Sequence, residues 1–203
     1  MNILRHTYHL LVLIVFFTMS ACSYPKNFTR DFYETNEKVI VGLKNEYTRL
    51  YNQKPFAILF EDKSFKNIGF EIITDSIKYI YHFSLAERNF ADTLNRYQYD
   101  APKIIALINN LQKIQCTWIT KLDYYENFAE RYLVLMAIRN KALNSAFKGE
   151  SYCTLAFFEN PQPVDKDGKF LDRADRKRRR MINDYELRRV NDRVGYAITK
   201  KYR

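Results

Sequence analysis

The apolar run at residues 10–17 constrains this chain most, because its length decides what the amino-terminal segment can be. Extended through Met19, the run covers about ten residues, which suits the apolar core of a secretion signal. A membrane-spanning helix needs about 20 apolar residues, since each residue rises only about 1.5 Å. Arg5 precedes the run and supplies the positive charge that such signals carry. We therefore predict that residues 1–21 are a signal peptide and that the mature chain begins at Cys22.

The signal ends in a large apolar residue, two small residues and a cysteine, Met19-Ser20-Ala21-Cys22. This tetrapeptide resembles the lipobox of bacterial lipoproteins, although leucine is usual where Met19 stands. The resemblance implies that the Cys22 thiol receives a diacylglyceryl group, that cleavage follows, and that the new amino terminus is acylated. Two alternatives stay open. Ordinary cleavage after Ala21 leaves a soluble exported domain, although Met19 fits poorly where such cleavage wants a small residue, and an uncleaved run leaves a membrane anchor.

A lipidated Cys22 places the mature chain in the cell envelope, attached through its amino-terminal lipid to a bacterial membrane. The periplasmic side of the outer membrane is favoured over the inner membrane. More than one acyl chain makes such attachment stable, because each buried methylene contributes about 0.8 kcal/mol. We expect a lipidated tether at residues 22–28, an α+β globular domain at 29–160, and a linker with a basic carboxy-terminal helix at 161–203.

Hydrophobic periodicity predicts an α+β fold, with an antiparallel sheet of about five or six strands and helices packed on a face. The expected helices cover residues 29–50, 84–97, a segment opened by Asp100-Ala101-Pro102, and a short piece near 141–147. The expected strands cover residues 56–60, 68–74, 77–83, 116–122, 132–138 and 152–158, with helix as an alternative for 132–138. Leu187, Val190, Val194 and Ala197 recur at near-heptad spacing, which predicts an amphipathic carboxy-terminal helix that Gly195 weakens.

Cysteine and histidine usage limits the possible chemistry. After Cys22 the chain has Cys116 and Cys153, which predict either a disulfide in an exported protein or two buried thiols. His82 is the only histidine beyond the signal, so a multi-histidine zinc site is excluded. Neither of the two common glycine-rich phosphate-binding motifs, G-x-x-x-x-G-K-[ST] and G-x-G-x-x-G, occurs in the sequence. We predict no metal, no cofactor and no catalytic constellation.

A carboxylate-based hydrolase is the enzymatic alternative, because acidic side chains alone can hydrolyse glycosides. Its formal candidates are Glu61, Asp62, Asp123 and Glu126. Nothing in their spacing selects a pair. The leading hypothesis is therefore a non-catalytic, lipid-anchored binding or assembly subunit of the envelope, and the alternative is a soluble exported ligand-binding domain.

The charge of the chain is concentrated near its end. Residues 165–203 hold 14 Lys or Arg and 7 Asp or Glu, and the densest part is the basic run Arg176, Lys177, Arg178, Arg179 and Arg180. Five consecutive cations attract phosphate-bearing surfaces. Export makes nucleic acid an unsuitable partner, so we expect an anionic lipid or lipopolysaccharide, or an envelope protein complex. A solvated helix start is the alternative interpretation.

Overall fold

The computed structural model describes residues 24–74, 78–126, 129–139, 150–172, 175–182 and 184–200. The expected signal, Cys22 and the short helix near 141–147 lie outside these residues. The chain forms two compact units, Met1–Glu37 and Lys38–Arg203, and α2 (Tyr24–Gln53) belongs to both. The helix begins within the segment expected to be a tether. Within the first unit, Arg30 Nε donates to Glu34 Oε1 at 2.8 Å, one helical turn further on.

The Lys38–Arg203 unit is built on one antiparallel sheet of eight strands, so the predicted α+β class and antiparallel sheet are confirmed, while the predicted count of five or six is too low. The strand order is β3-β2-β1-β4-β5-β6-β10-β9. The bounds are β1 Phe56–Phe60, β2 Asn67–Ile73, β3 Lys78–Ser84, β4 Cys116–Glu126, β5 Ala129–Arg139, β6 Tyr152–Phe158, β9 Arg188–Arg189 and β10 Val194–Thr199. A separate pair joins β7 (Met181–Ile182) to β8 (Tyr185–Glu186).

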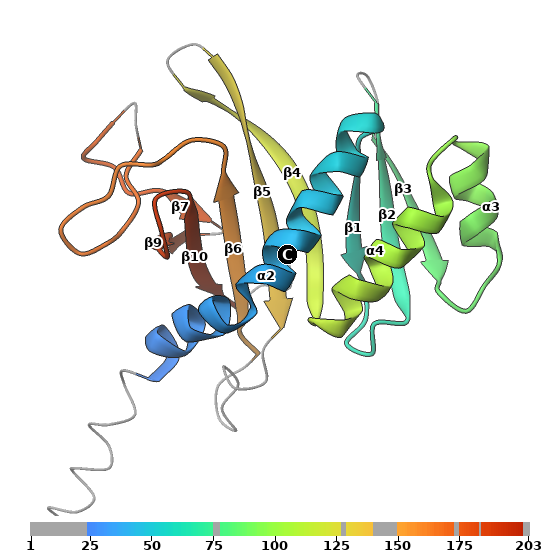
Figure 1. Ribbon diagram of the computed structural model, residues 1–203, viewed down its shortest axis with the longest axis horizontal. Coiled ribbons are helices and arrows are strands. Elements are labelled where there is room, and N and C mark those ends of the chain that lie inside the picture. Colours follow the sequence, from blue (N-terminus) through green and yellow to red (C-terminus); the bar gives the residue numbers. More distant parts are fainter. Residues whose placement is uncertain are drawn as a thin grey trace, which may run out of the picture. The chain divides into compact units, whose positions relative to one another are not determined.

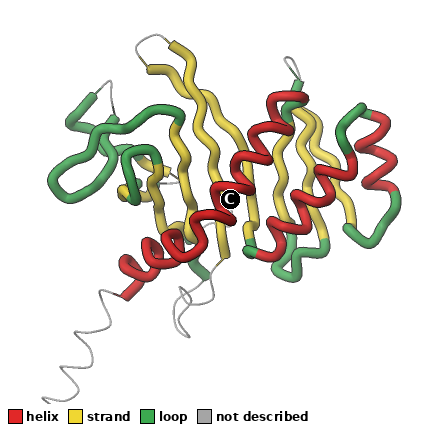
Figure 2. The backbone as a smooth tube through the Cα atoms, in the orientation of Figure 1, coloured by secondary structure: helices red, strands yellow, loops and turns green. Residues whose placement is uncertain are grey.

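Residues 38–53 of α2, together with α3 (Asn89–Arg96) and α4 (Ala101–Lys113), cover one face of this sheet (Figures 1 and 2). Aromatic side chains fill the space beneath them: the Phe56 and Phe70 rings stack at 5.3 Å, and Tyr99 packs edge-on against both. The buried Tyr47 hydroxyl donates to the Phe56 carbonyl oxygen at 2.7 Å. Burial raises the pKa of Tyr47 well above its ordinary value, so this hydroxyl stays a donor.

The two predicted starts of the central helices have different outcomes. α4 begins as predicted, because the Asp100 carboxylate accepts the Lys103 backbone N–H at 3.3 Å and proline stands in the first turn. The predicted start at Ser84 is wrong, since α3 begins at Asn89. Ser84 is the last residue of β3, and its carbonyl oxygen accepts the Glu87 N–H in a turn. Ser84 therefore pairs with Asn67 of β2 and does not cap the helix predicted to begin there.

The predicted carboxy-terminal helix is also wrong, because the described part of this segment forms β7 to β10 and connecting turns. β10 pairs with β6 over six positions, from Val194 opposite Phe157 to Thr199 opposite Tyr152. A β-rich sequence gains more from this ladder than from an isolated helix. The segment covers part of the second face of the sheet, where Phe170 and Leu187 join a buried cluster with Phe158. None of the helices in the described ranges is both long and apolar enough to span a bilayer.

Candidate functional site

A cavity of about 440 Å³ lies on the second face of the sheet, beside the carboxy-terminal cluster. Its floor is apolar and comes from β4, β5 and β6, with the side chains of Trp118, Leu122, Leu133, Leu135 and Phe158. Its rim comes from the carboxy-terminal segment, with Asp172, residues 178–182 and Leu187. The cavity therefore joins an apolar surface to a charged edge.

Strand alternation and register bring the floor together. Leu122 stands opposite Leu133, and Leu133 stands opposite Phe158 on its other side, so these three side chains form a row on one face. Trp118 precedes Leu122 by four residues in β4 and shares its face. Lys121 points to the other face, where its ammonium lies over the Tyr51 ring of α2 at 4.7 Å. Leu122 is 44% exposed, which is high for a leucine at the centre of a sheet.

The basic run does not form one continuous positive patch, because Arg179 forms ion pairs with carboxylates of the same segment. Its guanidinium pairs with Asp165 at 3.2 Å, Asp167 at 3.5 Å and Glu186 at 2.5 Å. Hydrogen bonds from Lys169 and Arg179 lower the pKa of Glu186. The Lys169 backbone N–H lowers the pKa of Asp165, with a further contribution from the positive charge of Arg179. These carboxylates largely neutralise Arg179 at the rim.

Arg178 and Arg180 keep their charge available at the cavity. The Arg180 guanidinium lies 5.2 Å from the centres of both the Tyr124 and Phe158 rings, and its Nε donates to the Leu171 carbonyl oxygen at 3.2 Å. The Arg178 side chain is exposed. Within the described ranges, no carboxylate pairs with either guanidinium. The rim therefore presents two arginines that can accept an anionic partner.

The structure divides the five predicted cations. Arg176 and Lys177 occupy an exposed turn outside the cavity lining. The run forms turns and bridges rather than the helix start expected for it, and Leu171 pairs with Arg179 in an isolated bridge. The sequence alone does not identify the floor residues of the cavity as a site. Alternation in β4 places Trp118 and Leu122 on one face, but nothing local indicates that this face stays partly open.

Cys116 and Cys153 are free and buried thiols in the structure, which is the second of the two alternatives that the sequence leaves open. The register explains this, because Cys116 in β4 and Cys153 in β6 flank Ile138 of β5 on opposite sides. Two strand spacings separate the Cα atoms by roughly 9.5 Å, beyond the roughly 7 Å that a disulfide spans. Burial raises the pKa of each thiol to about 12, so both stay protonated.

The four candidate acids occupy separate local structures, and none lines the cavity. Asp62 accepts the backbone N–H groups of Lys66 and Asn67 at 2.9 and 2.6 Å and shapes the turn before β2. Partial burial raises its pKa, but the hydrogen bonds it accepts outweigh this and lower the pKa. Glu126 accepts a hydrogen bond from Asn160 Nδ2 at 3.1 Å. Asp123 is exposed opposite Tyr132.

His82 contacts Glu61 through Nδ1 on the second face of the sheet, and its side chain is 66% exposed. Gly69 of β2 lies between β1 and β3, paired with both Leu59 and His82. A Cβ at Gly69 would stand 3.1 Å from Glu61 Oε1, so the glycine leaves room for this carboxylate. Among the described residues, Glu61 is the only hydrogen-bonding partner of the ring. This pair has the form of a surface hydrogen bond rather than a nucleophile with its base.

No group of three or more His, Cys, Asp or Glu side chains in the described ranges is arranged to hold a metal ion. The arginine-rimmed cavity combines apolar contact with available positive charge, and we take it as the candidate site. Comparison of the chain with protein-family models, with curated proteins and with solved structures gave no match in any of the three.

Proposed function

We propose that this chain is a non-catalytic, lipid-anchored binding subunit of the bacterial envelope that takes up an anionic amphiphile in the arginine-rimmed cavity. The observation that carries the binding function is the meeting of an apolar floor with the Arg178 and Arg180 guanidiniums. The anchoring rests on Met19-Ser20-Ala21-Cys22 and its resemblance to a lipobox. A lipid with an anionic headgroup is the ligand class that fits both halves of the cavity.

The chemistry of the lining favours this ligand class. A guanidinium binds phosphate or carboxylate through two parallel hydrogen bonds, and its strength grows where water is partly excluded. Leu122 and Leu133 offer the apolar contact for an alkyl chain, at about 0.8 kcal/mol for each methylene buried. The volume of about 440 Å³ lies within the range of small-ligand sites. Among the described residues of the lining, Asp172 is the one carboxylate beside three guanidiniums, so an anion is preferred to a cation.

Trp118 supplies a direct assay, because it is the only tryptophan of the chain and lies in the cavity. Decyl phosphate, added below its micellar concentration, is expected to change the Trp118 emission saturably. An uncharged decyl glucoside is expected to bind at least about tenfold more weakly, since it makes no charge-assisted hydrogen bond. Lengthening the alkyl chain by one methylene is expected to tighten binding roughly fourfold until the cavity is filled.

The arginine contribution is tested with matched variants of the basic run. Arg178→Gln and Arg180→Gln are each expected to weaken decyl phosphate binding by about tenfold, the value for a partly exposed charged hydrogen bond. Arg176→Gln removes the same charge two residues away and is expected to change affinity by less than about twofold. Equal effects of all three variants would mean that the run acts through general charge alone, and would reject the cavity as the site.

Anchoring needs a separate measurement. The mature chain from the membrane fraction is expected to carry the mass of an acylated amino-terminal cysteine, and Cys22→Ala is expected to leave the protein unprocessed and unacylated. A soluble mature chain of unmodified mass would reject anchoring and favour the soluble exported ligand-binding domain. The Trp118 titration is unaffected by that outcome, so the two halves of the proposal are tested independently.

A further inference from the structure

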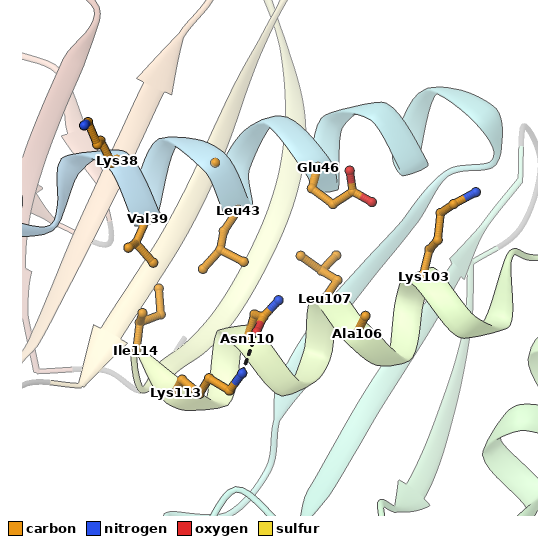
Figure 3. A pocket seen from close by; sticks show the side chains of 11 residues that line it. Lys38, Val39, Leu43, Glu46, Lys103, Ala106, Leu107, Asn110, Lys113 and Ile114 are labelled. Atoms are coloured by element: carbon orange, nitrogen blue, oxygen red, sulfur yellow. Dashed lines mark hydrogen bonds between the residues drawn. The ribbon is translucent and has the colours of Figure 1, made fainter.

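A groove of about 500 Å³ runs between α2 and α4 on the helix-covered face of the sheet (Figure 3). Leu43 from α2 and Leu107 from α4 point toward one another and are buried at its floor. Val39 lines the same groove and is 52% exposed, although it is apolar. Alternation in β4 sends Trp118 and Lys121 to opposite faces, so this groove and the arginine-rimmed cavity lie on different sides of the sheet.

Gly42 keeps the groove open at a position where the fold does not require glycine. It lies in the interior of α2, where glycine is the least favourable residue apart from proline. A Cβ built on Gly42 meets no atom within 4 Å, so no neighbour in the fold excludes a side chain. Ala106 of α4 also lines the groove and is exposed. Two small residues allow the backbone of another chain to approach closely.

The charges at the groove select the occupant. Lys38, Lys103 and Lys113 line it, against the single carboxylate of Glu46. Glu46 is already held by Arg49, whose Nη2 lies 2.6 Å from Glu46 Oε1. The Lys103 ammonium is likewise held, since it pairs with Asp100. No described carboxylate pairs with Lys38 or Lys113, and Lys113 donates to the Asn110 amide oxygen at 3.0 Å. The lining therefore complements an acidic surface.

We propose that this groove docks an acidic amphipathic helix of a partner protein. Its apolar residues contact the exposed Val39 and Ala106 above the buried floor, and its carboxylates reach Lys38 and Lys113. A helix is favoured over a strand because α2 and α4 satisfy their backbone groups internally and offer no free edge for strand addition. The apolar stripe of a partner helix is narrow enough to fit between α2 and α4. The absence of a side chain at Gly42 leaves space for its side chains to enter the groove.

The test uses labelled synthetic peptides and the full mature chain. One peptide of about 18 residues has leucines spaced three and four apart with glutamates elsewhere, and its counterpart has lysine at every glutamate. Fluorescence anisotropy is expected to show at least about tenfold tighter binding of the acidic peptide, weakening as salt is added. Gly42→Leu fills the groove and is expected to weaken that binding about tenfold without lowering the thermal midpoint.

Arg178→Gln, on the other face, is the control and is expected to leave peptide affinity unchanged. Equal binding of the two peptides, no binding of the acidic one, or an unchanged affinity for Gly42→Leu would overturn the proposal. Sedimentation velocity distinguishes the remaining occupant. A dimer that Gly42→Leu dissolves would assign the groove to a second copy of this chain and would also overturn the proposal.

Discussion

Gly195 is the position where a single added methyl group tests the structure of the carboxy-terminal segment. A Cβ at Gly195 would lie 2.6 Å from Phe170 Cε2 and 2.8 Å from Leu187 Cγ, closer than such atoms approach in folded proteins. Both neighbours are buried, with exposures of 0% and 1%. Neither side chain can therefore move aside into solvent, and the strand or the cluster must shift.

The size of the effect follows from this crowding. Adding a methyl group to a filled core costs about 1–3 kcal/mol, so Gly195→Ala is expected to lower the unfolding free energy by that amount. For a domain of this size each 1 kcal/mol shifts the thermal midpoint by about 2–4 °C, which gives a fall of roughly 2–12 °C. Gly42→Ala is the matched control, because the new methyl group meets open space and improves helix propensity. It is expected to raise the midpoint by roughly 2–4 °C.

The assay is thermal and denaturant unfolding followed by circular dichroism, with Trp118 emission as a second probe of the cavity. Leu187→Ala, combined with Gly195→Ala, relieves part of the contact, so the double variant is expected to be more stable than the sum of the two single losses implies. A Gly195→Ala protein within about 0.5 kcal/mol of the parent would refute the packing of Phe170 and Leu187 against β10.

Three further outcomes follow from local contacts. Without reductant, Cys116 and Cys153 are expected to react slowly with a thiol reagent in the native protein and both to react rapidly in denaturant, because burial raises their pKa to about 12; one or no reactive thiol would indicate the disulfide. The carboxyl pKa values of Asp165 and Glu186 are lowered from 3.8 and 4.5, so their stabilisation is present above those values and is lost as pH falls through the lowered ones. Denaturant midpoints measured down to about pH 2 are expected to fall less steeply for Asp165→Asn, and identical slopes would contradict this. Asp100→Ala removes the N-cap of α4 and is expected to cost about 1 kcal/mol in unfolding free energy, whereas an unchanged midpoint would mean that the cap contributes nothing.

Local sequence patterns predict those helices and strands whose start or extent is determined by neighbouring residues. The apolar runs at 56–60 and 152–158 give strands with the bounds of β1 and β6, and Asp100 with the following proline marks the start of α4. The structure of the carboxy-terminal segment depends instead on a strand that is distant in the sequence. Val194 and Ala197 share one face of a helix as readily as they sit in a strand, and pairing with β6, some 40 residues earlier in the chain, decides between the two. The periodicity of the carboxy-terminal segment gives no information about this distant partner strand.

The candidate site is less predictable than the fold, because its floor and rim come from segments far apart in the sequence. The basic run indicates an anionic partner, yet the pairing of Arg179 with Asp165, Asp167 and Glu186 depends on how the carboxy-terminal segment folds. Composition reveals the excess charge and not its distribution. The apolar floor consists of residue types that are also common in buried cores, so only the register of β4, β5 and β6 shows that these side chains meet.

The fate of the five cations separates the two structural interpretations of the run. On a helix, consecutive arginines project at about 100° intervals around the axis, and each contributes similarly to a diffuse positive field. In the observed segment, three acids hold Arg179, aromatic rings hold Arg180 beside the cavity, and Arg176 lies in a solvated turn. A diffuse field predicts equal losses of anion affinity for neutralising Arg176 and Arg180, whereas the observed arrangement predicts a loss for Arg180 and little change for Arg176. The unequal response is therefore the signature of a built site rather than of net charge.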